Sequence, residues 1–502
     1  MSTGVGQDGG SDMTLAASRA DVVVIGGGLA GISAAIQLAD AGRAVTLIEG
    51  RPWLGGATCS FIRRGLTIDN GQHAFLRCCT AYRELLARLG VAGSYSMQNR
   101  LDLTILAGAA SGSPARARLR RSALPAPAHL VRALAGYRLL SPAERLKIAG
   151  VAVALQFTDP LGGDGRSLDW WLARHRQGER ARTKFWDWLC VTALNVEPEH
   201  ADLALAGSAI RTALLAGRDG ADIGVPDVPL SGLHGGAAVA LLGTLGVTIK
   251  LGVRAIAVQP GLAGGYLVRT ASAGPGRSAE VPDVVGGGAA EDIRADGVVL
   301  AVPPGEAAAL APPELAGEAA RWSLLRPSPI VSVHVIYGSR VTRLPFAGVV
   351  GSPVRWVIDK SDAAGLHAGQ YLAAAIPAAD EFVDMPAMQL RERVLPVLDR
   401  LFPAAAGARI EDFFVTRERR ATIRHEPGTQ QLRPAAGLPG LAVAGAWTDT
   451  GWPDTMEGAV RSGRYAARKL MSGLTDGLAA RSARQPAGRV TAASAVASGA
   501  PR

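Results

Sequence analysis

A glycine pattern near the N-terminus constrains the fold of this chain more than any other feature. Residues 21–25 and 44–49 are β-branched and apolar, which is typical of short buried strands, and residues 29–41 are rich in alanine and leucine, as in a helix. Gly26, Gly28 and Gly31 lie in the order G-x-G-x-x-G between the first strand and the helix. A strand, a glycine turn, a helix and a second strand predict a βαβ unit, and therefore an α/β fold with a parallel sheet.

Each position of this glycine pattern has a physical role. Gly26 allows the tight turn, Gly28 lets the backbone approach a pyrophosphate, and Gly31 lets the helix pack closely against the strand. The free N–H groups and the positive dipole end of the helix attract phosphate. Glu49 ends the second strand, where its carboxylate accepts hydrogen bonds from ribose hydroxyls and repels a 2′-phosphate. We therefore predict a Rossmann-type domain that binds FAD or NAD.

Positive charge is concentrated in one segment of the chain. The formal net charge is +10, and residues 114–147 hold seven arginines and one lysine against Glu144 alone. Apolar residues are interleaved with these charges, and a basic amphipathic segment of this kind suits an anionic membrane surface. A solvated helix face explains the same pattern, so both interpretations stay open. No recognition motif accompanies the charge, and we expect no binding of nucleic acid.

Composition indicates the class of protein and its compartment. Apolar residues make up 48% of the 502 residues and charged residues 19%, which predicts a large buried core. The four cysteines form no C-x-x-C pair and show no zinc-site spacing, which predicts a reduced compartment and no metal site. No apolar run reaches the roughly 18 residues of a membrane-spanning helix, and residues 1–20 lack a signal-peptide pattern. We expect a cytoplasmic protein, peripheral at the inner membrane if the basic segment binds lipid.

A second glycine motif follows the second strand and decides between FAD and NAD. It consists of an acidic residue followed by R-x-x-x-G-G-x-T, and it resembles the flavin amine oxidase and phytoene desaturase superfamily. The residues concerned are Glu49, Arg51, Gly55, Gly56, Ala57 and Thr58. The resemblance implies FAD, with residues 55–57 beside its diphosphate and ribityl chain and Arg51 near the phosphate. Val253 matches a superfamily position whose backbone contacts adenine, although an ordinary strand residue would look the same.

The C-terminal part resembles the same superfamily. A short strand ends in the turn Gly445-Ala446, and a helix is predicted to begin near Thr455 and Met456. The resemblance implies that the turn holds the ribityl chain and that the helix directs its N–H groups at the flavin. The superfamily usually has Gly-Asp at this turn, so Ala446 departs from the pattern and Asp449 is a candidate substitute.

Four longer stretches narrow the resemblance. They are residues 69–73, 75–82, 419–422 and 445–463, and they resemble the hydroxysqualene dehydroxylase family of bacterial hopanoid biosynthesis, also described as squalene-associated FAD-dependent desaturases. The superfamily likeness extends over about residues 20–470. The resemblance implies that hydroxysqualene and reduced FAD give squalene, water and oxidised FAD. It therefore implies a C30 polyprenoid substrate and a long apolar cavity, whereas the reductant of FAD stays unknown.

Loss of a hydroxyl group as water needs a proton, so a general acid should lie beside the flavin. His73 is the first candidate, because its segment passes the flavin ring in the superfamily and an imidazole donates protons near neutral pH. Gln72 is a candidate hydrogen-bonding group at the flavin edge, and Asp454 is an alternative acid. Each has a plainer interpretation: a histidine bonded to backbone, a turn residue and a helix N-cap.

Three residues are predicted to line the substrate pocket: Trp186, Asn195 and Trp452. The first two lie in a helical middle section, where spacings of three and four make them core residues by default. A share of such residues should face the substrate chain, and Asn195 is a candidate partner for its hydroxyl group. Trp452 either walls the pocket or packs in the core.

The order of the predicted elements indicates two interleaved domains. Residues 21–95, 230–304 and 412–472 are expected to form the FAD-binding domain, and residues 96–229 and 305–411 a second domain of mixed or antiparallel sheet plus helices. Residues 1–20 and 473–502 are expected to be a disordered lead and a disordered tail.

Other functions share these motifs and stay open at this stage. A carotenoid-type desaturase would move a hydride from a C–H bond to the flavin and would need no general acid. A non-catalytic protein that retains FAD and binds isoprenoids would fit the loss of the acidic residue at position 446. Amine oxidation is disfavoured, because none of the five lysines lies in a flavin-proximal motif.

Overall fold

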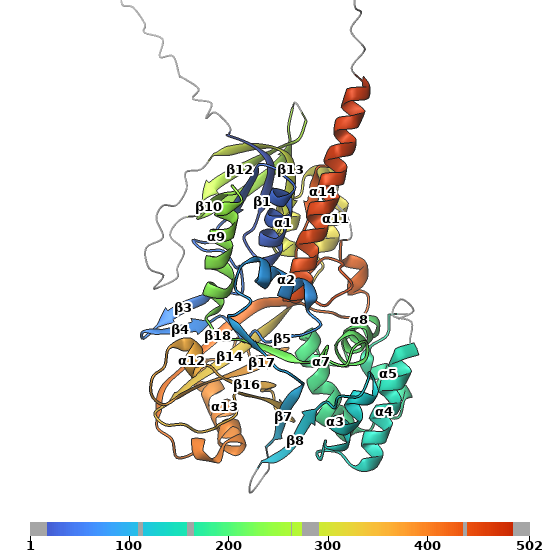
Figure 1. The fold of residues 1–502 in the computed structure, drawn as a ribbon, viewed down its shortest axis with the longest axis vertical. Helices are drawn as coiled ribbons and strands as arrows, with labels where there is room; N and C mark the ends of the chain where they lie inside the picture. The colour runs from blue at the N-terminus through green and yellow to red at the C-terminus, as the bar shows by residue number, and fades with distance from the viewer. Residues whose placement is uncertain are drawn as a thin grey trace, which may run out of the picture.

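The computed structural model describes residues 18–108, 114–157, 165–262, 264–273, 291–434 and 439–484. Within these residues the chain forms two seven-stranded sheets and a group of helices beside the second sheet. In Figure 1 the first sheet occupies the upper half of the molecule, the second sheet lies at the lower left, and the helical group lies at the lower right.

The first sheet is mainly parallel and contains the predicted βαβ unit. Its order is β10-β2-β1-β13-β12-β11, and β19 also pairs with β13. The parallel strands are β1 (Ser18–Ile25), β2 (Val45–Glu49), β10 (Thr248–Leu251), β13 (Asp292–Leu300) and β19 (Leu441–Val443), with β11 (Val253–Pro260) and β12 (Tyr266–Ser272) antiparallel. Parallel strands are buried on both faces, which explains the continuous apolar run in β1. The predicted α/β fold is confirmed.

Helices cover both faces of this sheet. Helices α1 (Leu29–Asp40), α2 (Thr80–Arg88), α9 (Ala237–Thr244) and α14 (Met456–Arg484) pack with Val22 and Val24 of β1 in one core. Helices α10 (Pro304–Leu310) and α11 (Ala316–Trp322) pack with Val23 and Ile25 in the core of the other face. Alternate residues of one strand therefore enter two different cores, as the two-residue period of a strand requires.

The second sheet is mainly antiparallel, in the order β18-β14-β17-β16-β15-β7-β8. Its strands are β18 (Ile410–Ile423), β14 (Pro327–Tyr337), β17 (Gln370–Pro377), β16 (Trp356–Asp359), β15 (Phe346–Val350), β7 (Asp102–Ala107) and β8 (Ala115–Arg120). Helix α13 (Ala387–Leu401) covers one face. The helical group packs in a separate core and comprises α3 (Val131–Ala135), α4 (Pro142–Phe157), α5 (Leu168–Arg174), α7 (Asp187–Leu194) and α8 (Leu203–Ile210).

Smaller elements connect the two sheets. Strands β3 (Ser60–Arg63) and β4 (Leu66–Asp69) form a hairpin, and β5 (Phe75–Leu76), β9 (Ile223–Pro226) and β6 (Tyr95–Met97) form a three-stranded sheet. Two further short helices are α6 (Glu179–Ala181) and α12 (Ser361–Ala364).

The structure moves four of the predicted domain boundaries. Strand β18 pairs with β14, so residues 412–423 belong to the second sheet and not to the FAD-binding domain. Residues 305–322 of α10 and α11 pack on the first sheet, although they were assigned to the second domain. Helix α14 continues to residue 484, past the predicted start of the tail at 473, and β1 begins within the predicted lead. Residues 1–17 and 485–502 lie outside the described residues.

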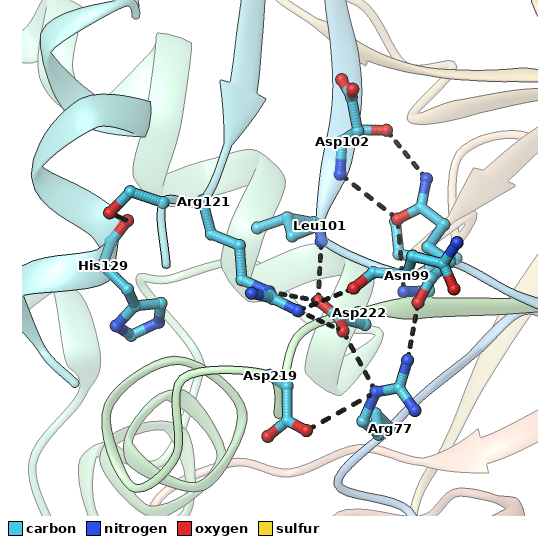
Figure 2. Close-up of polar contacts among 11 residues, drawn as sticks. Arg77, Asn99, Leu101, Asp102, Arg121, His129, Asp219 and Asp222 are labelled. Carbon is cyan, nitrogen blue, oxygen red and sulfur yellow. Dashed lines mark hydrogen bonds and ion pairs between the residues drawn. The ribbon is translucent and has the colours of Figure 1, made fainter. Parts of the chain in front are cut away.

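A buried carboxylate fixes the small sheet against β7 and β8 (Figure 2). Asp222 is fully buried and accepts hydrogen bonds from the N–H of Leu101 at 2.6 Å and from Nε of Arg77 at 3.0 Å. Arg121, at the end of β8, binds both carboxylate oxygens of Asp222 at 2.6 and 2.8 Å. Breaking a buried pair of this kind typically costs about 3–5 kcal/mol, so this cluster holds the connecting segments rigidly.

None of the helices in the described ranges combines the length and apolar character that crossing a lipid bilayer requires.

Candidate active site

A cavity of about 790 Å³ lies where the first sheet, the second sheet and the helical group meet. Most of its wall is apolar and comes from β7, β8, α3, α4, α7 and α8; examples are Leu103, Leu119, Leu134, Ile148, Trp188 and Ile210. Its polar lining comes from the segments after Gly55 and β4, from β14 and β18, and from the turn before α14; these residues are Thr58, Asn70, Gln72, His73, Ser332, Thr416, Glu418, Thr422, Asp454 and Thr455. A largely apolar cavity with a few polar groups suits a large apolar ligand that reacts at one position.

The first glycine turn borders this cavity. Gly28 has an extended backbone with φ −73°, and a methyl group there would lie 4.0 Å from its nearest neighbour, Cα of Gly56. A methyl group at Gly31 would lie only 1.9 Å from the carbonyl oxygen of Gly26. Gly31 therefore serves the close packing of α1 on β1, whereas Gly28 leaves an open surface that a ligand can approach.

The second glycine motif is hydrogen-bonded to the first. The N–H of Gly55 donates to the carbonyl of Gly27 at 2.8 Å, and Arg51 donates to the carbonyl of Gly56 at 2.8 Å. Gly55 and Gly56 have φ values of 110° and 61°, in the left-handed region that favours glycine. The two motifs together form one cradle at the carboxyl ends of β1 and β2.

Three other predicted cofactor residues stabilise or flank this cradle. The carboxylate of Glu49 accepts from the N–H groups of Gly27 at 2.7 Å and Arg51 at 2.8 Å. Thr58 is buried, and its hydroxyl donates to the carbonyl of Gly55 at 2.7 Å. Val253 is fully buried at the start of β11, directly after Gly252, whose N–H donates to the carbonyl of Arg51. The prediction that Val253 contacts adenine stays a prediction.

The turn after β19 is held by a residue that the sequence did not single out. Gly445 adopts φ 152°, and Ala446 lines the cavity together with Thr455 and Met456. The buried guanidinium group of Arg433 donates to the carbonyls of Ala446 at 3.1 Å, Trp447 at 3.1 Å and Trp452 at 2.8 Å. A fixed array of carbonyls of this kind gives the turn a defined shape without an acidic residue at position 446.

Asp449 does not line the cavity in the part of the chain that the structure describes. It accepts hydrogen bonds from Gln430 at 2.6 Å and from the N–H of Gly451 at 3.2 Å. That Asp449 substitutes for an acid at position 446 stays a prediction.

The segment after β4 presents polar atoms that have no partner within the described residues. Both amide atoms of Gln72 and Nδ1 of His73 are buried without a hydrogen bond. A buried polar atom without a partner costs about 1–3 kcal/mol, so such atoms indicate a ligand with complementary donors and acceptors. The edge of a flavin ring carries both, and the open glycine cradle suits a pyrophosphate, so the residues present fit FAD.

A buried ion pair anchors this segment. Asp69 accepts from Nζ of Lys360 at 2.7 Å, from Oγ of Ser60 at 2.8 Å and from the N–H of Leu230 at 3.0 Å. Asp69 and Lys360 are 3% and 8% exposed, which leaves little water to weaken their attraction. Lys360 follows β16, so the pair ties the loop that carries Gln72 to the second sheet.

The two candidate acids have opposite electrostatic environments. Burial lowers the pKa of His73 from its usual value, although the nearby carboxylate of Asp69 opposes the shift. Burial raises the pKa of Asp454 to about 6, although the hydrogen bond from Ile423 and the charge of Arg433 oppose that shift. A neutral imidazole and a carboxyl group that is protonated below about pH 6 are therefore the forms that these surroundings favour.

Asp454 is not the N-cap of α14. Its Oδ2 accepts from the N–H of Ile423 at 2.7 Å, and its own N–H donates to Nε2 of His425 at 2.8 Å. The hydroxyl of Thr455 accepts from the N–H of Gly458 at 3.3 Å and supplies the cap. The side chain of Asp454 is therefore directed across the turn toward β18, where it lines the cavity.

The structure brings only two of the three predicted pocket residues to the cavity. Trp186 lines it, with its indole N–H bonded to Gln177 at 3.0 Å. Asn195 lines it as well, but its amide donates to the carbonyl of Ser328 at 3.1 Å and to the hydroxyl of Thr422 at 3.0 Å, so both amide hydrogens are used. Trp452 is not among the residues that line the cavity, so its position agrees with the other interpretation, packing.

Trp452 instead packs beneath a charged group. The guanidinium carbon of Arg461 lies 4.9 Å from the centre of a Trp452 ring, and Arg461 also pairs with the buried carboxylate of Glu457 at 2.6 Å. Glu457 in turn accepts from the N–H groups of Ala81 and Tyr82 at the start of α2. Trp452 therefore belongs to the joint between α2 and α14.

Comparisons with known proteins agree with this architecture. A family described as "Flavin containing amine oxidoreductase" matches residues 29–471. Hydroxysqualene dehydroxylase from Rhodopseudomonas palustris is 30% identical over 466 residues, which cover 90% of this chain and 98% of that protein. Zeta-carotene desaturase from Arabidopsis thaliana is 24% identical over 506 residues, which cover 89% of this chain and 84% of that protein.

A solved structure shows the same fold at low sequence identity. Cyclohexylamine oxidase from Brevibacterium oxydans is 19% identical and aligns with a TM-score of 0.66 over 91% of this chain and 99% of that chain. At this level of identity the likeness concerns the fold alone.

The contrast between Gly28 and Gly31 predicts separable effects on cofactor binding and on stability. In Gly28→Ala the added methyl group fits the protein but covers the surface that a pyrophosphate must approach, so we expect FAD retention to fall about tenfold or more with little change in Tm. In Gly31→Ala the clash with Gly26 should lower the Tm. Flavin absorbance per protein and thermal unfolding measure both effects, and full FAD loading of folded Gly28→Ala would contradict the assignment.

Proposed function

The chain belongs to the family of flavin-containing amine oxidoreductases, and from this premise we propose that it is an FAD-dependent hydroxysqualene dehydroxylase of hopanoid biosynthesis. The substrate is the C30 alcohol hydroxysqualene, and the products are squalene and water. The observation on which the proposal depends most is Asp454, a carboxyl group with a raised pKa on the wall of a largely apolar cavity that also borders the glycine cradle.

The reaction separates into a heterolysis and a reduction. The C–O bond of the allylic alcohol breaks with its electron pair on oxygen, and the proton of Asp454 converts the departing oxygen to water. The new C–H bond is completed by a hydride, two electrons and one proton, which is the chemistry that reduced FAD would supply when held by the glycine cradle. The carboxylate of Asp454 then regains a proton from solvent, so atoms and electrons balance.

The residues of this chain prepare these steps in three ways. The apolar walls exclude water and hold a hydrocarbon chain, which favours a proton transfer confined to one polar site. Gln72 and His73 provide buried hydrogen-bonding atoms for the flavin edge. We assign the acid to Asp454 and not to His73, because burial favours the protonated form of a carboxyl group but the neutral form of an imidazole.

Two other functions would fit part of the site. A carotenoid-type desaturase fits the fold and the apolar cavity, and the Arabidopsis relative is of that kind, but its identity is lower and a desaturase has no need of Asp454. The second function is that of a non-catalytic protein that retains FAD and binds isoprenoids. The absence of an acidic residue at position 446, where this chain has Ala446, would fit it. Arg433 now gives another explanation for that residue, because it fixes the shape of the turn.

The direct test is an anaerobic single turnover. The purified protein is reduced with dithionite and mixed with hydroxysqualene, and we expect flavin absorbance near 450 nm to return while squalene forms in equal amount. An oxidised sample mixed with squalene and with carotenoid precursors is the matched control. Reoxidation only in the second arrangement, with hydride moving to the flavin, would identify a desaturase, and no reaction in either would favour the non-catalytic alternative.

The role of Asp454 predicts a specific pH dependence. The rate should be highest below about pH 6, where the carboxyl group is protonated, and should fall about tenfold per pH unit above it. In Asp454→Asn we expect a loss of roughly 10²- to 10⁴-fold and no such fall with pH, because the amide carries no transferable proton. His73→Gln is the comparison, and if that variant abolishes the pH dependence while Asp454→Asn keeps it, the acid is His73.

We also propose that the protein contacts an anionic membrane through the helices at one side of the cavity. Val131, Leu146 and Phe157 of α3 and α4 are 63%, 73% and 86% exposed, which is unusual for large apolar side chains. Exposed Arg132 and Lys147 lie on the same two helices. Val131, Ile148 and Val153 of α3 and α4 also line the cavity, so a lipid-soluble substrate would enter from this side.

The structure narrows the basic segment that the sequence indicated. Residues 115–120 form a strand and not an amphipathic helix. Arg118 and Arg120 pair with Asp102 at 2.5 and 3.3 Å, and Arg121 pairs with buried Asp222 (Figure 2). These three arginines serve the fold, and the remaining basic residues of the segment are Arg116 of β8 and those of α3, α4 and their connection.

A set of surface variants tests the membrane proposal. We expect the triple variant Arg132→Glu, Arg138→Glu, Lys147→Glu to bind vesicles containing phosphatidylglycerol about 100-fold more weakly, since each basic residue contributes about 1 kcal/mol at an anionic surface. Leu146→Ser with Phe157→Ser should weaken binding to the same vesicles. The control is Met388→Ser, an exposed apolar residue of α13. Unchanged sedimentation of the first two variants would show that α3 and α4 are solvated faces.

A further inference from the structure

The stretch 419–422, which the resemblance singled out, forms a bulge in β18. Ile330 of β14 is opposite Glu418, and Ser328 is opposite Thr422, so three residues of β18 face Pro329 alone. Proline has no N–H to donate, which is why prolines within sheets occur at bulges and edges. Both strands therefore contribute to the bulge: β18 has the extra residues, and β14 has the proline opposite them.

The bulge sorts its side chains into two directions. Arg419 and Arg420 are exposed and pair with Asp384 at 2.7 Å and with Glu306 at 2.8 Å. Glu418, Ala421 and Thr422 line the cavity. Bulges often redirect side chains beside active sites, and this one presents a carboxylate to the cavity while turning two positive charges away from it.

The bulge also shortens the span of β18 between Glu418 and the residue whose N–H holds Asp454. Four residues of a regular strand span about 13 Å, but Glu418 and Thr422 face positions only two residues apart on β14, about 7 Å. Ile423 follows directly and its N–H holds the carboxylate of Asp454 at 2.7 Å. Glu418 and Asp454 are thus brought to neighbouring parts of one cavity wall.

Glu418 lies beside the cofactor cradle and has no ion-pair partner within the described residues. The amide of Asn70 donates to the carbonyl of Ala57 at 3.2 Å and to Oε2 of Glu418 at 3.3 Å, and thereby links the second glycine motif to this carboxylate. The cavity that Glu418 faces is mostly apolar. Glu418 is only partly buried, and a positive charge arising in the apolar cavity beside its carboxylate would be attracted to it.

We propose that Glu418 stabilises the positive charge that develops on the allylic carbons as the C–O bond breaks. This inference rests on the proposed function, in which Asp454 protonates the departing oxygen. The carboxylate of Glu418 forms no bond and transfers no proton. It lowers the energy of the cationic transition state by Coulomb attraction across a largely apolar cavity. Two carboxyl groups thus have distinct tasks, one as acid and one as fixed negative charge.

The test compares Glu418→Gln with Glu411→Gln. Glutamine keeps the size of Glu418 and can still accept from Asn70, whereas Glu411 lies on the same strand but is 43% exposed and pairs with Arg409. Single-turnover reoxidation with hydroxysqualene is the first readout, and we expect about a 100-fold loss in Glu418→Gln and no loss in Glu411→Gln. FAD content and Tm are measured in both variants.

The second readout does not depend on turnover. A squalene-length analogue with a tertiary ammonium in place of the reacting carbon mimics the cation, and an equally long hydrocarbon is its neutral counterpart. Quenching of tryptophan fluorescence reports their binding. The wild-type protein should prefer the ammonium analogue, Glu418→Gln should lose this preference by roughly 30-fold or more, and the neutral analogue should bind both equally.

The outcomes distinguish a failure of the proposed function from a failure of the proposed role of Glu418. If the wild-type protein does not convert hydroxysqualene, the proposed function is wrong. If it does, while Glu418→Gln keeps both the rate and the preference for the ammonium analogue, only the role of Glu418 is overturned. If Glu418→Gln loses FAD or stability, Glu418→Asp keeps the charge and should retain the preference; loss of the preference in that variant also overturns the role.

Discussion

The site depends on a buried ion pair that joins the β3–β4 hairpin to the second sheet. Asp69 ends a hairpin of the N-terminal segment, Lys360 follows a strand of the second sheet, and their 2.7 Å contact is nearly removed from water. Removing one partner of such a pair leaves an uncompensated charge and typically costs about 3–5 kcal/mol. The loop with Gln72 and His73 follows Asp69 directly, so the ion pair fixes the position of its buried polar atoms that have no partner in the described residues. Specific binding of a cofactor edge requires that rigidity.

Other polar groups of the site are likewise fixed in position by a residue from another part of the chain. Arg433 binds four carbonyls of the turn after β19, His425 accepts the N–H of Asp454, and Asn70 links Ala57 to Glu418. These contacts satisfy the backbone of an irregular turn inside the molecule, which would otherwise carry unpaired groups. They also leave the carboxyl groups of Asp454 and Glu418 directed at the cavity, where neither has a cationic partner among the described residues.

Local sequence was enough to predict the βαβ unit, because a glycine pattern between two apolar strands has one stable arrangement. Gly31 is packed against Gly26 as that arrangement requires. Pairing between distant segments was not predictable in this way. Strand β18 was assigned to the wrong domain, since nothing in residues 410–423 identifies β14 as its neighbour. The same limit hid Lys360 and Glu418, whose partners Asp69 and Asn70 are far away along the chain. For Trp452 the sequence left two interpretations open, because a tryptophan that packs under an arginine looks the same in sequence as one that faces a cavity.

The fold itself does not choose between amine oxidation, desaturation and dehydroxylation, since it is shared with an amine oxidase at 19% identity. The choice must lie in the polar wall of the cavity. Removal of a hydride from a C–H bond needs an acceptor but no acid, whereas loss of water needs a proton donor and produces a cation. An acid with a raised pKa at Asp454 and an unpaired carboxylate at Glu418 answer those two needs in an otherwise apolar space. A bulge opposite Pro329 is what brings them together, so a backbone irregularity of the second sheet, more than the cofactor domain, distinguishes the chemistry.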